Sequence, residues 1–124
     1  MVTDRAKLNQ VVFNLLINSI KYADDDPREF TVRIELGETR DDFVLKFKDW
    51  GMGIKREYAD RIFEDGFRTP EASSKDPTGS GLGLTISKII MEQLKGNLVL
   101  ANAYKPTEFH LVLPKRLDRK ERVR

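Results

Sequence analysis

Three polar residues near the N-terminus have the types and spacing of a phosphate and metal site. On a helix, Asn14, Asn18 and Lys21 fall within about 60° of one another. Leucine, isoleucine and valine take most of the remaining circumference, so this stripe differs from an ordinary solvated face. An amide oxygen can bind Mg²⁺, and an ammonium group can bind a phosphate. The stripe is therefore either the wall of a pocket or a short surface strip on a core helix.

A carboxylate in a buried register is the second candidate. Asp49 continues the odd-numbered series of Phe43, Leu45 and Phe47, so we expect its side chain on the buried side of a strand. Burying a carboxylate is costly unless it is hydrogen-bonded. Asp49 therefore either caps the turn that follows it or accepts a hydrogen bond from an amino group of a ligand.

A run of glycines forms the third candidate. Gly79, Gly81 and Gly83 precede a predicted helix, where exposed N–H groups and the helix dipole favour anions. The run is not a dinucleotide-binding fingerprint, because no strand precedes it and Leu84 stands where that motif needs a final glycine. It is not a P-loop either, since no Gly-Lys-Ser/Thr follows. By itself the run also fits a flexible hinge.

Hydrophobic periodicity predicts the elements that must position these residues. Helical spacing indicates a helix over residues 4–23 with Asp4 as its N-cap, and further helices over residues 54–63 and 82–95. Strict alternation predicts strands over residues 30–36 and 43–48, and we expect the last two strands over residues 98–101 and 109–113. This order is typical of an α+β fold, a two-layer α/β sandwich in which a mixed, mainly antiparallel sheet is covered on one face by three helices.

Two further expectations concern the last predicted helix and the loop before it. We expect the helix to bury Leu82, Ile86, Ile89 and Ile90 and to end at Gly96. Residues 64–80 are rich in proline, glycine, serine and threonine, and a loop of this length is typically a functional lid or disordered.

Composition excludes several classes of protein. The 124 residues fit one globular domain, and the absence of cysteine excludes disulfides and thiolate metal sites. No apolar run approaches the roughly 18 residues of a membrane span, and no signal core follows Met1, so we expect a cytoplasmic location and no membrane contact by this domain.

Charge is unevenly divided along the chain. Six basic and two acidic residues give residues 115–124 a charge of +4, so the total of +2 leaves −2 for residues 1–114. We therefore expect a domain over residues 1–114 that does not bind nucleic acid, followed by a basic tail that is solvated.

Taken together and in order, these motifs resemble the GHKL ATPase family, most closely the catalytic domain of sensor histidine kinases. Residues 8–23 resemble its N box, residues 49–54 its first glycine box and residues 62–68 its phenylalanine box. Residues 79–90 are similar to its second glycine box, and residues 106–114 to its closing strand. Four boxes in the family's order are far more specific than one motif alone.

The resemblance implies that the protein binds ATP with Mg²⁺. By this likeness Asn18 is the metal ligand, and Asn14 assists it through hydrogen bonds or a metal-bound water. Lys21 meets a phosphate, and Tyr22 lies against the nucleoside. Asp49 accepts a hydrogen bond from the adenine amino group, which would select adenine over guanine.

The other boxes imply further contacts. Gly51 and Gly53 would shape the adenine slot with Ile54 as its apolar wall, and Thr107 would reach the base through water. Contacts to the phosphates are implied for four residues of the second glycine box, namely Gly79, Gly81, Leu82 and Gly83. Arg68 and Lys75 are possible cations of the lid, although charges in loops are usually solvated.

The type of residue 14 bears on the reaction. Hydrolytic relatives in this superfamily carry a carboxylate near this place, and the amide of Asn14 cannot take a proton from water. A neutral imidazole attacks with a free lone pair and needs no base, so we expect γ-phosphoryl transfer to a histidine in two-component signalling. A protein serine kinase of the anti-sigma type and a nucleotide-sensing module without transfer activity stay open as alternatives.

The acceptor histidine is not expected in this chain. His110, the only histidine, lies in a predicted strand and is followed by Leu111 and Val112, whereas the family's acceptor lies on a helical hairpin and precedes an acidic residue. The partners implied are a dimerisation domain that bears the histidine and a response regulator downstream. Whether the chain is an excised domain or a separate kinase stays open.

Overall fold

Four strands pair into one sheet in the order β1-β2-β4-β3. The computed structural model describes residues 4–23, 30–70 and 83–115. Every pair of neighbouring strands is antiparallel, so the mixed sheet that we predicted is fully antiparallel in the described chain. The strands are β1 (Val32–Glu38), β2 (Asp42–Asp49), β3 (Asn97–Ala103) and β4 (Thr107–Pro114).

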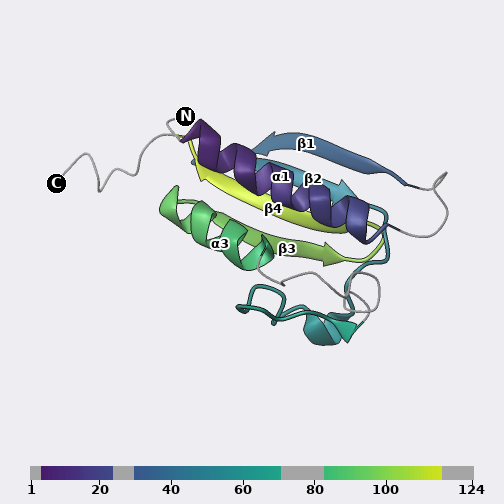
Figure 1. The fold of residues 1–124 in the computed structure, drawn as a ribbon. Helices are drawn as coiled ribbons and strands as arrows, with labels where there is room; N and C mark the ends of the chain where they lie inside the picture. Colours follow the sequence, from purple (N-terminus) through teal and green to yellow (C-terminus); the bar gives the residue numbers. More distant parts are fainter. Residues whose placement is uncertain (1–3, 24–29, 71–82, 116–124) are drawn as a thin grey trace.

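Two α-helices among the described residues, α1 (Arg5–Lys21) and α3 (Gly83–Gln93), cover one face of this sheet (Figure 1). Apolar side chains from both layers form one core between them. The buried members are Val11, Leu15, Phe47, Ile62, Ile90, Met91, Leu94, Leu98, Phe109, Leu111 and Leu113. None of the described helices is long and apolar enough to cross a membrane.

Helix α1 begins as its sequence indicates. The Asp4 side chain accepts hydrogen bonds from the backbone N–H groups of Ala6 and Lys7, which otherwise have no partner in the helix. The helix ends at Lys21, with Tyr22 as its C-cap. The helix was predicted to run to residue 23, so the observed one is two residues shorter at this end.

The helix predicted over residues 54–63 is not formed. A single short 3₁₀ helix, Arg56–Tyr58, is followed by separate turns in which Arg61 N–H bonds the Tyr58 carbonyl and Glu64 N–H bonds the Arg61 carbonyl. A short segment gains little from a continuous helical ladder, because nucleation is costly. The turns still bury Ile62, so the apolar pattern correctly predicted burial at this position although the backbone there is not helical.

The buried stripe of α3 differs from the predicted one. Ser87, Ile90 and Met91 are buried, whereas Ile86 and Ile89 are 39% and 49% exposed, so their predicted burial is wrong. The serine occupies a core position because its hydroxyl has a hydrogen-bond partner on α1, Asn14. Leu82 lies outside the described residues.

The end of α3 is a Schellman turn. Lys95, with φ of 66°, donates its N–H to the Glu92 carbonyl, and Gly96 donates to the Met91 carbonyl. Gly96 thus follows the helix as predicted, but the left-handed residue is Lys95. Glycine is required at position 96 because a Cβ there would overlap the carbonyl oxygen of Val112 on β4.

Candidate functional site

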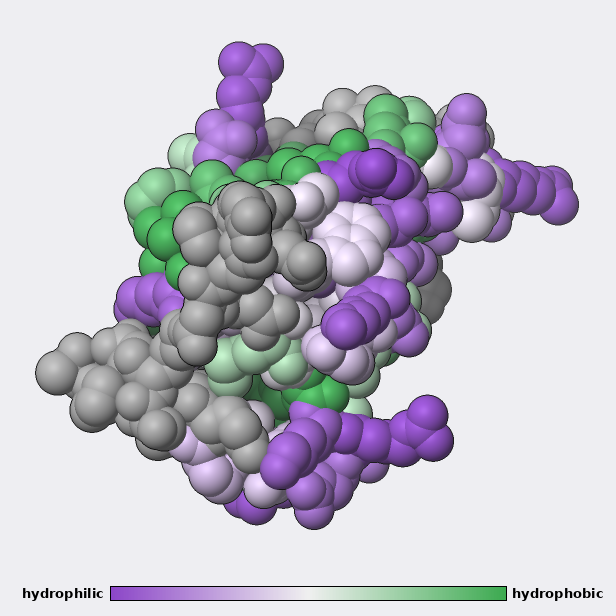
Figure 2. Space-filling model, turned by 90° about the vertical axis from the view of Figure 1, so that its right-hand side faces the viewer, coloured by the Kyte–Doolittle hydropathy of each residue, from purple (hydrophilic) through white to green (hydrophobic). Residues whose placement is uncertain are grey.

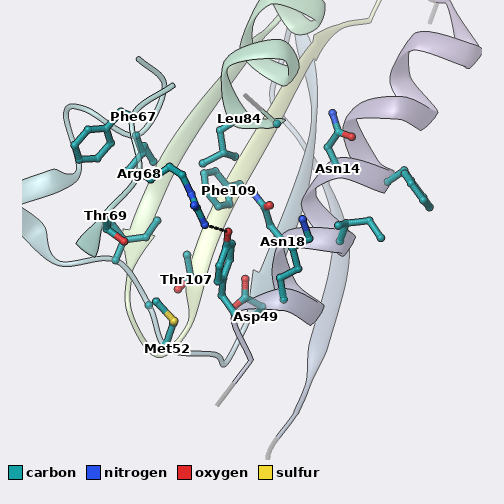
Figure 3. A pocket seen from close by; sticks show the side chains of 18 residues that line it. Asn14, Asn18, Asp49, Met52, Phe67, Arg68, Thr69, Leu84, Thr107 and Phe109 are labelled. Atoms are coloured by element: carbon teal, nitrogen blue, oxygen red, sulfur yellow. Dashed lines mark hydrogen bonds between the residues drawn. The ribbon is translucent and has the colours of Figure 1, made fainter. Parts of the chain in front are cut away.

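A pocket of about 330 Å³ lies between α1, the first turn of α3, the ends of β2 and β4, and the segments 52–54 and 62–69 (Figure 3). Seen from the side in Figure 2, the molecule is hollowed, with hydrophobic residues at the floor and hydrophilic ones along the rim. Ten residues singled out in the sequence line the pocket, namely Asn14, Asn18, Lys21, Tyr22, Asp49, Gly53, Ile54, Arg68, Gly83 and Thr107.

The polar stripe of α1 forms one wall of the pocket. Because Val11, Leu15 and Ser19 face the sheet, Asn14 and Asn18 lie on the flank of the helix that the pocket borders. Within the described part of the chain, the Asn18 side-chain amide has no hydrogen-bond partner. Its polar atoms are therefore available to a ligand.

Asn14 differs from Asn18 because its amide is anchored. Its Nδ2 donates to the hydroxyl of Ser87 on α3 over 3.2 Å, and Ser87 is fully buried. This bond joins the two helices directly beside the pocket.

Asp49 lies at the end of β2, on the face of the sheet that the helices cover. Its Oδ1 accepts the N–H of Gly51 over 3.1 Å, and its Oδ2 lies 3.3 Å from the Ser19 hydroxyl. Burial raises the pKa of the Asp49 carboxyl, and the bonds from Gly51 and Ser19 oppose this rise. Asp49 thus caps the turn that follows it, as the first of the two sequence expectations has it. It also lines the pocket, and a hydrogen bond to an amino group of a ligand stays a prediction.

The segment after Asp49 is tied to two neighbouring elements. Met52 N–H bonds the Tyr22 carbonyl at the end of α1, and Ile54 N–H bonds the Ala103 carbonyl at the end of β3. Between them Gly53 has φ of 77°, and a Cβ there would overlap the Tyr104 ring. These bonds hold the wall formed by residues 52–54 in place.

Thr107 stands directly beside Asp49. The two residues are register partners in the β2–β4 ladder, and Thr107 donates its hydroxyl to the Ala103 carbonyl over 3.1 Å. Its oxygen keeps acceptor capacity at the same end of the pocket as the Asp49 carboxylate.

Two described residues that the sequence analysis named, Gly51 and His110, do not line the pocket. Gly51 is buried behind it and contributes the N–H that Asp49 accepts. Gly79, Gly81 and Leu82 lie outside the described residues, as does Lys75. His110 is on the opposite face of the sheet, because Thr107 and Phe109 alternate with it, and its Nε2 lies 2.5 Å from Oε2 of Glu108.

The other lining residues, which are apolar except for Thr69, escaped the sequence analysis as site residues. They are Phe13, Ile17, Met52, Ile62, Phe67, Thr69, Leu84 and Phe109. Phe13 and Ile17 could have been found, because each directly precedes an asparagine of the polar stripe. Phe109 follows Thr107 at the strand period of two. Nothing in the sequence distinguishes Met52.

Aromatic side chains support the segment opposite α1. The Tyr58 and Phe67 rings lie 5.9 Å apart, and the Arg61 guanidinium lies 4.3 Å from the Phe67 ring centroid. The next residue, Arg68, donates from Nη2 to the Tyr22 hydroxyl over 3.4 Å, across the pocket (Figure 3).

The chemistry of the pocket is divided between its ends. Asp49 and Thr107 lie at one end and Asn14 and Leu84 at the other (Figure 3). Apolar walls with an acceptor at one end fit a flat ring that carries an amino group, and the cations Lys21 and Arg68 suit an anion. Among the described residues no three His, Asp or Glu side chains form a group that could hold a metal ion, and the Asn18 amide oxygen could supply one ligand.

Comparison with known proteins gives a consistent set of relatives. The family described as "Histidine kinase-, DNA gyrase B-, and HSP90-like ATPase" matches residues 3–117. The chain is 33% identical over 115 residues to the autoinducer 2 sensor kinase/phosphatase LuxQ of Vibrio vulnificus, covering 90% of this chain and 13% of the relative. It is 32% identical over 113 residues to the sensor protein SrrB of Staphylococcus aureus, covering 90% and 19%.

Solved structures agree with these matches. The mycobacterial sensor histidine kinase MprB superposes with a TM-score of 0.76 at 30% identity, over 92% of this chain and 76% of that one. The catalytic domain of histidine kinase ThkA superposes with a TM-score of 0.73 at 24% identity, over 91% and 70%, which shows a shared fold.

Proposed function

The chain belongs to the HATPase_c family of histidine kinase-, DNA gyrase B- and HSP90-like ATPases, and on this premise we propose that it binds Mg-ATP and transfers the γ-phosphoryl group to a histidine. The acceptor histidine lies on a dimerisation domain outside this chain, in the same or a separate protein. A response regulator receives the phosphoryl group downstream. The proposed catalytic unit is residues 1–114.

The observation that carries this proposal is the placement of Asp49 and the α1 stripe in one pocket. Asp49 offers a partly buried acceptor to the adenine amino group, and Tyr22, Gly53 and Ile54 border the same space. Thr107 reaches the base through a water. Guanine presents a carbonyl where adenine presents the amino group, so the carboxylate repels it.

The phosphate end is assigned to α1 and the first turn of α3. Lys21 and Arg68 neutralise phosphate charge, and the amide of Asn18 supplies one oxygen to Mg²⁺, which spreads the negative charge of the phosphates. Asn14 accepts a hydrogen bond from a metal-bound water. Gly83 borders this end of the pocket. Gly79, Gly81 and Leu82 are proposed to contact the phosphates as well.

Transfer is favoured over hydrolysis by the residues around the pocket. Among the described residues that line it, Asp49 alone has a carboxylate, and it lies at the end of the pocket opposite Asn14 (Figure 3). No described group near Asn14 can therefore act as a base toward water. An imidazole nucleophile needs no such base.

One labelling experiment tests the proposal. The chain is mixed with γ-labelled ATP, Mg²⁺ and the isolated dimerisation hairpin of the LuxQ relative as a surrogate acceptor. We expect label on the hairpin that resists alkali and is lost in acid, as phosphohistidine is. Label that resists acid would indicate a serine kinase, and ATP binding without label would indicate a nucleotide-sensing module. Rapid ATP hydrolysis by the chain alone, abolished by Asn18→Ala, would contradict the transfer mechanism.

A further inference from the structure

Ser87 lies at a place in α3 where an apolar residue would be expected. It shares the buried stripe with Ile90 and Met91, and its side chain has no exposed surface. A buried hydroxyl costs free energy unless it is hydrogen-bonded. Its partner is the Nδ2 of Asn14, which donates to the serine oxygen over 3.2 Å.

In the structure this bond turns the NH₂ end of the Asn14 amide toward Ser87. An asparagine amide has two chemically different ends, a carbonyl that accepts and an NH₂ group that donates. With Nδ2 bonded to Ser87, Oδ1 remains, and within the described residues it accepts no hydrogen bond. An acceptor in this place can bind a metal-bound water, whereas an NH₂ group in the same place could only donate to phosphate.

The bond also sets the position of α3 relative to α1. Ser87 follows Gly83 by one helical turn, and Gly83 borders the pocket. A second side-chain hydrogen bond between the described parts of the helices, from Lys7 to Gln93, is exposed and lies at their far ends. The Asn14–Ser87 pair is therefore the buried polar link where the two helices meet beside the pocket.

We propose that Ser87 is a positioning residue for Asn14, whose amide it holds with the carbonyl oxygen toward the metal end of the pocket. This inference rests on the proposed function, because it assigns Asn14 to Mg-ATP. Ser87 itself does not line the pocket. Its effect on the nucleotide therefore passes through Asn14.

The test measures how strongly Mg²⁺ assists nucleotide binding. Calorimetry gives the Kd of ATP without and with Mg²⁺, and we call the ratio of the first Kd to the second the metal coupling. We expect Ser87→Ala to lower this ratio about fivefold, as for the loss of one hydrogen bond, and to leave the Kd of adenosine within about twofold. Ser87→Thr keeps the hydroxyl, so we expect this variant to have the metal coupling of the wild type.

Ser19→Ala is the matched control, since Ser19 is also a buried helical serine but its hydroxyl supports Asp49. We expect this variant to weaken adenosine binding and to leave the metal coupling unchanged. A double-mutant cycle separates positioning from packing. If Ser87 acts through Asn14, Ser87→Ala has no further effect on the coupling in an Asn14→Ala background.

The outcomes distinguish this inference from the proposed function. A wild-type chain that does not bind ATP overturns both. Wild-type binding with an unchanged metal coupling in Ser87→Ala, or independent effects of the two variants, overturns the positioning role alone. If Ser87→Ala no longer melts cooperatively, Ser87→Cys, whose sulfur is a weak acceptor, carries the same expectation.

Discussion

The hydroxyl of Ser19 lies 3.3 Å from Oδ2 of Asp49, so the helix that carries the polar stripe also supports the carboxylate at the other end of the pocket. The same hydroxyl lies 3.0 Å from the Leu15 carbonyl of its own helix. Gly51 N–H bonds the second carboxylate oxygen. Two hydrogen bonds hold the carboxylate in place, and burial still raises its pKa, because desolvation is the largest contribution.

Asp49→Asn is expected to weaken nucleotide binding. The amide cannot present two acceptor oxygens to the adenine amino group, so we expect a loss of about 2 to 3 kcal/mol for ATP and a comparable loss for adenosine. Calorimetry with both ligands measures this. Asp60→Asn is the control, because Asp60 is exposed and does not line the pocket. Unchanged adenosine affinity in Asp49→Asn would remove this residue from the base-binding end.

The same substitution is expected to stabilise the protein without ligand at neutral pH. A raised pKa means that the folded state binds the carboxyl proton more tightly than the unfolded state does. The protonated Asp49 therefore stabilises the fold fully below the ordinary pKa of 3.8, and this stabilisation is lost as the pH rises through the raised pKa. Asp49→Asn should therefore melt at a higher temperature than the wild type at pH 7. The difference should disappear as the pH falls below about 4.

Glu35→Gln provides a control of opposite sign. The hydrogen bond from Lys48 lowers the pKa of Glu35, so its stabilising effect is present above the ordinary value of 4.5 and is lost on acidification. This variant should melt below the wild type at pH 7. If the difference in melting temperature between Asp49→Asn and the wild type is the same at every pH, burial is not the cause of the raised pKa of Asp49.

Local patterns in the sequence are sufficient for the strands and for one wall of the pocket. The period of two through Phe43, Leu45 and Phe47 places Asp49 on the covered face, and the structure has it there. The helical period likewise brings Asn14 and Asn18 to one flank of α1. Both inferences need only the geometry of a single element.

Features that depend on contacts between elements could not be predicted in this way. The buried stripe of α3 includes Ser87 because Asn14 of another helix bonds it, and Ile86 is left exposed as a result. Residues 54–63 bury Ile62 from turns, since the bond from Ile54 to Ala103 and the packing of Phe67 constrain the segment. The residue pattern of one helix or strand carries no information about such partners on other elements.

Gly96→Ala is expected to destabilise the fold by more than about 2 kcal/mol. The added methyl group would overlap the backbone carbonyl of Val112, which forms the first pair of the β3–β4 ladder with Asn97 and also pairs with Val44 on β2, so it cannot move without disturbing strand pairing. Urea unfolding measures the loss. Gly83→Ala is the matched control, because a Cβ at that position has no atom within 4 Å. Equal stability of the two variants would show that α3 can shift away from β4.

Asn18→Ala is expected to weaken Mg-ATP binding about tenfold and to leave adenosine binding within about twofold, because the amide is assigned to the metal and not to the base. Calorimetry with Mg-ATP, metal-free ATP and adenosine separates metal binding from base binding. The loss of affinity should be confined to Mg-ATP. Asn9→Ala is the matched control, since Asn9 lies on the same helix, is exposed and does not line the pocket. An equal loss for adenosine would mean that Asn18 shapes the pocket as a whole, and the metal would then need another ligand.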